Sequence, residues 1–181
     1  MASRAKKGLI TDWWWSIDRW FLAAFLILMI FGMVLSFAAS PPVAERIGLD
    51  PFHFVKRHAF FLFPSIAVML ATSLLTPRGV RRMSIVMLGG ALFFMVWALF
   101  FGMEVKGARR WVDIGPLSLQ PSEFMKPSFV VVCAWLFAER SRRKDVPGNL
   151  FSIMLLMVVC ALLVAQPDLG QTILSTAVWG G

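Results

Sequence analysis

The residues best able to do chemistry lie in one stretch between two long apolar runs, from Lys106 to Lys126. Arg109 and Arg110 stand beside an indole, and a guanidinium can bind phosphate oxygens through a bidentate fork while stacking on an aromatic ring. Together with Lys106, they predict a site for a phosphate-bearing ligand. The pattern fits equally well a polar loop whose basic side chains reach water at a membrane surface.

The end of this stretch predicts the start of a helix. Gln120 precedes Pro121, which suits the first helical position, and Glu123 then places a carboxylate where the helix dipole favours it. Glu123 and Lys126 are three residues apart, so they share a helix face and can form an ion pair. That pair has two open interpretations: a contact that fixes helix packing, or part of a functional site inside the membrane region.

A second polar turn, residues 166–170, contains Asp168. Its carboxylate is expected either to cap the next helix or to meet a basic residue of the 103–120 loop, and the cap is favoured. His53 and His58 lack partners at metal-ligand spacing, so an interfacial role is expected and no metal site is predicted.

The composition identifies a membrane protein and excludes a soluble domain. Of the 181 residues, 59% are hydrophobic, and the mean hydropathy is +0.74. The net charge of +8 comes from short basic clusters beside apolar runs, which indicates membrane orientation and not nucleic-acid binding. Cys133 and Cys160 are expected at different depths in the membrane, so no disulfide is predicted.

The apolar runs predict an all-α polytopic membrane helix bundle with five complete transmembrane helices and the start of a sixth. Pro41-Pro42 is expected to end the first helix, residues 76–82 to form a basic turn, and Gly89-Gly90 to permit a close helix contact. Residues 1–181 are expected to form a single membrane domain, with 1–19 as a cytoplasmic or interfacial lead. The expected spans are Trp20–Ala39, His58–Leu75, Met83–Phe101, Pro121–Phe137 and Leu150–Ala165, with the sixth run beginning at Gln171.

The distribution of Lys and Arg predicts the orientation of the chain. Eleven of these residues fall in the lead, the 76–82 turn and the 138–149 loop, against six in the 40–57 and 103–120 loops. Because basic loops remain on the cytoplasmic side, the N-terminus is expected in the cytoplasm. The 103–120 loop and the 166–170 turn then share the outer side.

Three motifs occur in order along the chain: Lys106-Gly-Ala-Arg-Arg-Trp111, Gln120-Pro-Ser-Glu123 with Lys126, and Gln166-Pro-Asp-Leu-Gly170. Together they closely resemble the motifs of the SEDS family, the FtsW/RodA membrane proteins of bacteria. The front of the chain, from Asp12 to Trp20, looks like the FtsW branch and particularly its alphaproteobacterial members. The resemblance covers essentially the whole chain but only the first half or so of a family that has about ten helices, so the chain is expected to be the N-terminal part of a longer protein.

This resemblance implies a peptidoglycan glycosyltransferase that polymerises lipid II into glycan strands at the division septum, in the bacterial inner membrane. It implies substrate binding by seven residues, with the arginines neutralising the departing pyrophosphate. The family's catalytic base is an aspartate beyond Gly181, so no catalytic residue is expected in this span, and the span alone is expected to be inactive. The substrate-binding candidates are Lys106, Arg109, Arg110, Gln120, Glu123, Lys126 and Asp168.

The same resemblance implies a class B penicillin-binding transpeptidase, other division proteins and membrane lipid as partners. No cofactor is identified, and a divalent cation is left open. Two alternative functions also stay open: a lipid II flippase that uses the same charged cavity, and a non-catalytic membrane scaffold of the division machinery.

The predicted orientation can be tested by labelling single cysteines from outside the cell. A membrane-impermeant thiol reagent should modify Ser118→Cys in the 103–120 loop and spare Ser141→Cys in the 138–149 loop. The reverse pattern would overturn the orientation, and with it the shared outer position of the two polar segments.

Overall fold

The protein is described by a computed structural model that covers residues 13–15, 17–105, 107–114 and 117–181. Contacts divide the chain into two compact units, one ending at Leu75 and the other beginning at Thr76. The elements in chain order are α2 (Arg19–Arg46), α3 (His53–Ser73), α4 (Pro77–Phe101), β1 (Met103–Val105), β2 (Ala108–Ile114), β3 (Leu117–Leu119), α5 (Pro121–Arg142), α6 (Gly148–Ala165) and α7 (Leu169–Gly180). The single membrane domain expected over 1–181 stays a prediction.

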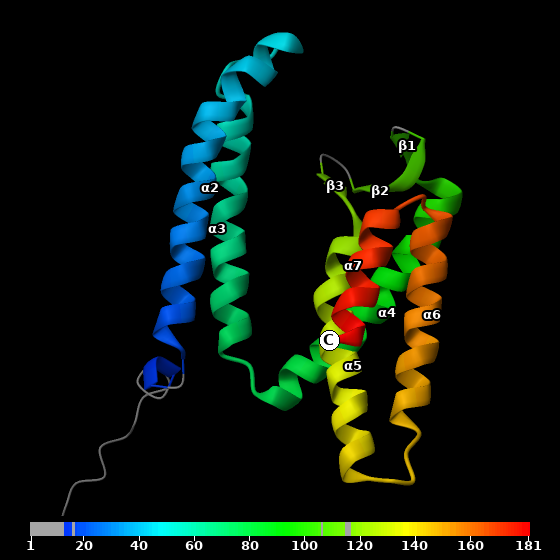
Figure 1. The fold of residues 1–181 in the computed structure, drawn as a ribbon. Helices are drawn as coiled ribbons and strands as arrows, with labels where there is room; N and C mark the ends of the chain where they lie inside the picture. The colour runs from blue at the N-terminus through cyan, green and yellow to red at the C-terminus, as the bar shows by residue number, and fades with distance from the viewer. Residues whose placement is uncertain (1–12, 16, 106, 115–116) are drawn as a thin grey trace, which may run out of the picture. The chain divides into compact units, whose positions relative to one another are not determined.

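The first unit is a hairpin of α2 and α3, which lie side by side and are joined by residues 47–52 (Figure 1). The expectation that Pro41-Pro42 ends the first helix is wrong, because α2 continues through both prolines to Arg46. Each proline lacks an amide N–H, so the backbone hydrogen bond that its position would donate is missing from the helix. Both prolines lie close to the end of α2, so only the last turn follows this interruption. Burial of Ala44 just beyond them shows that this last turn is packed.

The start of α2, at the open end of this hairpin, has aromatic and basic side chains around it. Asp18 caps α2, its Oδ1 accepting from the backbone N–H of the second helical residue, Trp20, at 2.9 Å. The Arg19 guanidinium lies 5.4 Å from the ring centroid of Trp14 and 5.2 Å from that of Trp15. Tryptophan and arginine together suit the headgroup level of a bilayer, as expected for the end of the 1–19 lead. Residues 1–12 of that lead lie outside the described residues.

The closed end of the hairpin is held by polar contacts. Ser40 Oγ in α2 donates to the Pro51 carbonyl at 2.7 Å. Asp50 accepts from the Phe52 backbone N–H at 2.7 Å and from Lys56 Nζ at 2.9 Å. The hydrogen bond from Lys56, with that from Phe52, lowers the pKa of the Asp50 carboxyl below its usual value.

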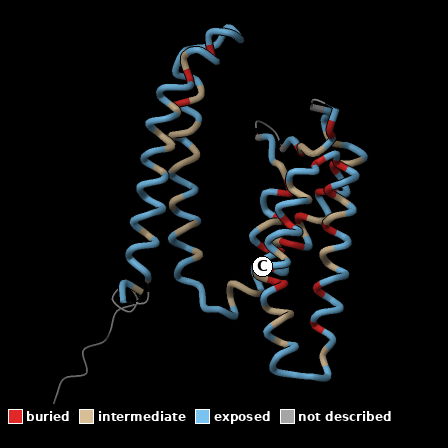
Figure 2. Tube along the Cα trace, in the orientation of Figure 1, coloured by how far each residue is buried: buried red, intermediate tan, exposed pale blue. Residues whose placement is uncertain are grey.

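The second unit packs α4, α5, α6 and α7 around one apolar core, visible as the buried positions of these helices in Figure 2. The buried apolar residues come from three of the helices, and Trp179 of α7 packs against them. Cys133 and Cys160 are both free cysteines, as predicted. The core consists of Leu88, Ala91, Met95, Met125, Phe129, Val132, Cys133, Val159 and Leu163.

The expected basic turn at residues 76–82 is almost entirely helical. Thr76 caps α4, its Oγ1 accepting from the Gly79 backbone N–H at 3.2 Å, and Pro77 occupies the first turn. A Thr cap followed by Pro is a strong signal for the start of a helix. The Thr hydroxyl oxygen accepts from one backbone N–H of the first turn, and Pro has no N–H that needs a partner there. The arginines at 78, 81 and 82 therefore lie on the first turns of α4 and not on a loop.

The 103–120 loop is a small antiparallel sheet in the order β1-β2-β3, a feature that the sequence did not predict. Met103 pairs with Trp111 and Glu104 with Arg109 between the first two strands, with an irregularity between Met103 and Glu104. Val112 pairs with Leu119 on the other side of β2. Gly107, in the turn before β2, has φ +79°, a left-handed conformation that suits glycine.

The helices confirm the polytopic membrane fold. Among the described residues, four helices are long and apolar enough to cross a membrane: α2, α3, α4 and α6. α5 is absent from that set because charged residues stand at both of its ends, and α7 has 12 residues. The count of five complete spans stays a prediction.

Close helix contacts occur at a different glycine from those expected. Within the described residues, no atom lies within 4 Å of a Cβ added at Gly89 or Gly90, so this pair does not mediate the expected contact. At Gly148, by contrast, an added Cβ would overlap the Leu136 carbonyl oxygen and lie 3.1 Å from Arg140 Cβ. Gly148 therefore lets the start of α6 approach the backbone of α5.

Replacing Gly148 by alanine should destabilise the second unit. The added methyl has to displace the α5 backbone, which we expect to lower the free energy of unfolding by about 1–3 kcal/mol. The matched control is Gly89→Ala, which meets open space and should be neutral or stabilising by up to about 1 kcal/mol through helix propensity. Thermal unfolding in detergent measures both, and equal melting temperatures would contradict the close contact.

Candidate functional site

The polar residues singled out by sequence gather at one end of the second unit, which we call the sheet end. It comprises the three strands, the start of α5 and the turn between α6 and α7, which lie together in Figure 1. The turn is held in place by Gln166, whose buried side chain donates from Nε2 to the Met95 carbonyl of α4 at 2.9 Å. This bond brings the 166–170 segment next to the strands.

Arg109 and Arg110 do not form a pair, because neighbouring residues of a strand point to opposite faces. Arg109 is half exposed, and its Nη2 lies 3.5 Å from Glu104 Oε2 on the paired strand. Such an exposed pair contributes little to stability and leaves the guanidinium accessible to a ligand. The expected cluster of two guanidiniums is thus divided between two faces of β2.

Arg110 binds Asp168, and this contact joins β2 to the start of α7. Its Nη1 lies 3.1 Å from Asp168 Oδ2, with the two side chains 30% and 11% exposed. Asp168 also caps α7, since its Oδ1 accepts from the Gln171 backbone N–H at 3.3 Å. The two roles expected of Asp168 as alternatives, helix cap and partner of a basic residue, are therefore both present.

The predicted pair on α5 is confirmed. Pro121 begins the helix after Gln120, and Lys126 Nζ lies 2.7 Å from Glu123 Oε2. The lysine is 25% exposed and the carboxylate 51% exposed, so the pair sits at the edge of the unit and not in its core. The Gln120 side chain is turned to the helix start, where its Nε2 donates to Ser122 Oγ at 3.0 Å.

Gln171 is a site residue that the sequence reasoning missed. Its Nε2 lies 3.5 Å from Glu123 Oε1, and its backbone N–H is bound by Asp168. A continuous polar cluster thus runs from Arg110 through Asp168, Gln171 and Glu123 to Lys126. The signal was available, because Asp168 and Gln171 have the spacing of a capping box, the motif in which Gln three residues after a cap reaches back to it. Here the amide reaches another helix instead.

His53 and His58 make none of the contacts of this cluster, and neither does Asp113 of β2. Lys106 lies outside the described residues. The Asp113 carboxylate accepts a hydrogen bond from the Ser118 hydroxyl across the β2–β3 pair. His53 and His58 belong to α3, and in the described part of the chain no group of three or more His, Cys, Asp or Glu side chains is placed to hold a metal ion.

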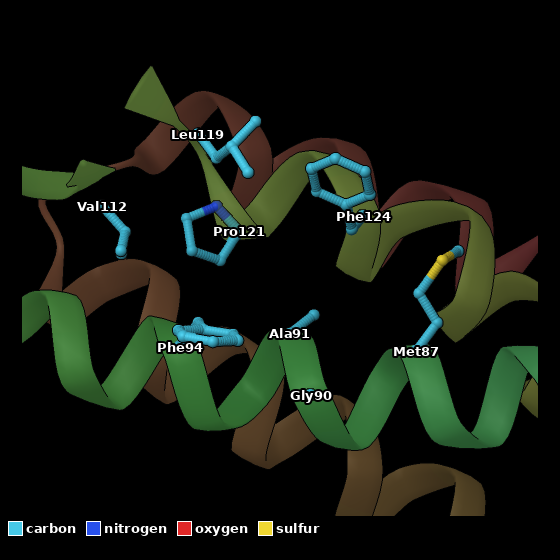
Figure 3. Close-up of a pocket in the computed structure, with 8 residues that line it drawn as sticks. All are labelled: Met87, Gly90, Ala91, Phe94, Val112, Leu119, Pro121 and Phe124. Carbon is cyan, nitrogen blue, oxygen red and sulfur yellow. The ribbon is translucent and has the colours of Figure 1, made fainter. Parts of the chain in front are cut away.

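An apolar pocket of about 250 Å³ adjoins the cluster. Figure 3 shows side chains of α4 on one side of it and residues of the strands and the α5 start on the other. Its lining has no polar side chain, so it suits an apolar group, and Pro121 on its wall is two residues from Glu123. The lining residues are Met87, Gly90, Ala91, Phe94, Val112, Leu119, Pro121 and Phe124.

Comparison with known proteins identifies the family of this chain. A family model for cell cycle proteins of the FtsW, RodA and SpoVE type matches residues 18–180. The chain belongs to this family. It is 46% identical over 179 residues to a probable peptidoglycan glycosyltransferase FtsW of Caulobacter vibrioides, covering 98% of this chain and 46% of that protein. The FtsW of Escherichia coli O6:H1, described in the same words, is 34% identical over 96% of this chain and 42% of its own length.

The solved structures support the same fold. The Thermus thermophilus rod shape determining protein RodA matches with a TM-score of 0.59 at 24% identity, over 81% of this chain and 48% of that one. A structure titled for the coordination of polymerization and crosslinking by a peptidoglycan synthase complex also gives a TM-score of 0.59, over 81% of this chain and 44% of that one. The chain spans less than half the length of the curated relatives named above.

For this FtsW/RodA-type chain, the polar cluster and the opposite face of β2 offer distinct chemical groups. Arg109 presents an accessible cation, and Arg110 is a cation oriented by a carboxylate. Glu123 and Asp168, the two carboxylates of the cluster, each already face a cation, so they are anions that orient other groups. The arrangement suits binding of an anionic ligand beside an apolar pocket.

The Arg110–Asp168 pair should matter more to the fold than the Arg109–Glu104 pair. Arg110→Ala leaves the buried Asp168 carboxylate without its cation, which we expect to lower the free energy of unfolding by about 1–3 kcal/mol. Arg109→Ala, the matched control on the same strand, should cost less than about 1 kcal/mol. A double-mutant cycle with Asp168→Ala measures the coupling directly, and a coupling near zero would contradict the contact.

Proposed function

We propose that the full-length protein is a peptidoglycan glycosyltransferase that polymerises lipid II, and that this chain supplies part of its substrate site. The observation that carries the proposal is the polar cluster, since three separate motifs meet at one end of a membrane unit in a chain 46% identical to a probable peptidoglycan glycosyltransferase. The cations would bind the pyrophosphate of the donor, and the adjoining apolar pocket suits a segment of its hydrocarbon chain.

In the proposed reaction, a sugar hydroxyl of the acceptor attacks the anomeric carbon of the donor, and the lipid pyrophosphate leaves. Negative charge grows on the leaving pyrophosphate, so an accessible guanidinium such as Arg109 stabilises the transition state more than the ground state. Arg110, Lys126 and Gln120 would bind other parts of the same ligand from the cluster side of β2, and Lys106 is included in the proposed site from its sequence motif alone.

We assign the general base to none of the carboxylates in this cluster. Glu123 is paired with Lys126 and Asp168 with Arg110, so each carboxylate is already engaged in orienting a cation. In this proposal the base is an aspartate in the part of the full-length protein beyond Gly181, and these two carboxylates position substrate-binding groups.

The proposed setting is the bacterial inner membrane at the division septum, with the N-terminus in the cytoplasm and the sheet end on the outer face. The proposed partner is a class B penicillin-binding transpeptidase, alongside other division proteins. Support comes from the relatives named FtsW and from the likeness to a chain of a complex whose title joins polymerization to crosslinking.

The test is polymerisation of lipid II by the purified full-length protein in detergent, with and without a divalent cation. Arg109→Ala should reduce the rate about 10- to 100-fold while membrane abundance is unchanged. The matched control is Arg142→Ala, an exposed arginine at the last residue of α5, which should behave as wild type.

Wild-type activity in Arg109→Ala would remove this arginine from the site. Absence of any glycan polymer, combined with transfer of lipid II across vesicle membranes by the same preparation, would overturn the glycosyltransferase in favour of a flippase. Absence of both activities would favour a scaffold.

A further inference from the structure

The polar cluster holds Gln171 by its backbone N–H and by its side-chain amide. Its backbone N–H is bound by Asp168 at 3.3 Å, and its Nε2 lies 3.5 Å from Glu123 Oε1. Asp168 and Glu123 are in turn held by Arg110 and Lys126. The glutamine therefore occupies the junction of β2, α5 and α7, with its amide set by charged groups on both sides.

The orientation of the amide follows from the chemistry of its neighbour. An ionised carboxylate only accepts hydrogen bonds, so the NH₂ group of Gln171 faces Glu123 and the carbonyl Oε1 faces the other way. That Oε1 is buried and has no hydrogen-bond partner among the described residues, and the same holds for Arg110 Nε. A buried polar atom without a partner costs about 1–3 kcal/mol, so proteins retain few of them.

These two atoms differ in kind. Arg110 Nε is a donor on a cation, whereas Gln171 Oε1 is a neutral acceptor, and Asp168 contacts both residues. A ligand that meets both would offer an anionic oxygen to the arginine and an O–H or N–H donor to the glutamine. A sugar pyrophosphate has these two features next to each other, because hydroxyl and amide N–H groups of the sugar lie beside the phosphate.

We propose that Gln171 is a specificity-determining residue of the site, and that its Oε1 accepts a hydrogen bond from a hydroxyl or amide N–H of the donor sugar. The inference rests on the proposed function for its substrate class. Glu123 then acts as a positioning residue, because its carboxylate holds the amide in the orientation that presents Oε1. In this arrangement, Lys126 holds the Glu123 carboxylate, and that carboxylate orients the Gln171 amide.

The experiment compares two ligands in detergent: lipid II, and undecaprenyl pyrophosphate, which has the phosphates and lipid but no sugar. Gln171→Met keeps the length of the side chain and removes its polar atoms. It should weaken binding of lipid II about tenfold and leave binding of undecaprenyl pyrophosphate unchanged. Gln171→Leu, which also lacks the acceptor and adds no charge, should do the same.

Thr176→Val is the matched control, since it removes a polar group from an exposed position of the same helix and should bind both ligands as wild type does. Equal loss of both ligands in the Gln171 variants, or a lowered melting temperature with no change in sugar preference, would show a structural role and overturn the proposal. Unchanged binding of both ligands would overturn it as well. Polymerisation by wild type tests the proposed function separately, because sugar-dependent binding through Gln171 does not require catalysis.

Discussion

The ion pair between Arg110 and Asp168 is the contact on which the sheet end depends. It joins residues 58 positions apart, and both Asp168 carboxylate oxygens are used, one by the guanidinium and one by the backbone N–H of Gln171. A charged pair removed from water is most stable when its remaining hydrogen-bonding capacity is met; the Asp168 carboxylate meets that condition, whereas Arg110 Nε has no partner among the described residues. The position of α7 fixes Gln171, and Gln171 reaches Glu123 on α5. Three elements thereby share one polar cluster.

The small sheet at this end of the unit provides hydrogen-bond partners for the backbone between α4 and α5. The connection between α4 and α5 has backbone groups that need partners beside an apolar unit, and strand pairing supplies them. Because successive residues of a strand point to opposite faces, the side chains of β2 fall into two sets, one on each face of the sheet. Val112 points to the apolar pocket, while Arg109 on the opposite face remains accessible. A helix in this position could not separate neighbouring residues so sharply, so strand geometry is what places an accessible charge and a pocket-lining apolar residue on opposite faces of one short segment.

The sequence predicted the contacts that are local. The Glu123–Lys126 pair follows from spacing along one helix, and the start of α5 follows from Gln120-Pro121, because both depend only on nearby backbone geometry. Local reasoning failed at Pro41-Pro42, where packing of Ala44 retains a helical turn that proline disfavours. At Gly89-Gly90 the described residues supply no close contact, because small residues permit such a contact but do not specify its partner.

By itself, the sequence determined that the protein spans a membrane with helices, and which polar segments interrupt them. Length and apolarity decide those features without reference to the rest of the chain. Only the tertiary structure decided which polar groups meet. The Arg110–Asp168 pair and the Gln171–Glu123 contact, 48 residues apart, depend on how α6 and α7 pack against α4 and α5. No spacing rule relates these positions, because their distance in space is set by the packing of the whole unit.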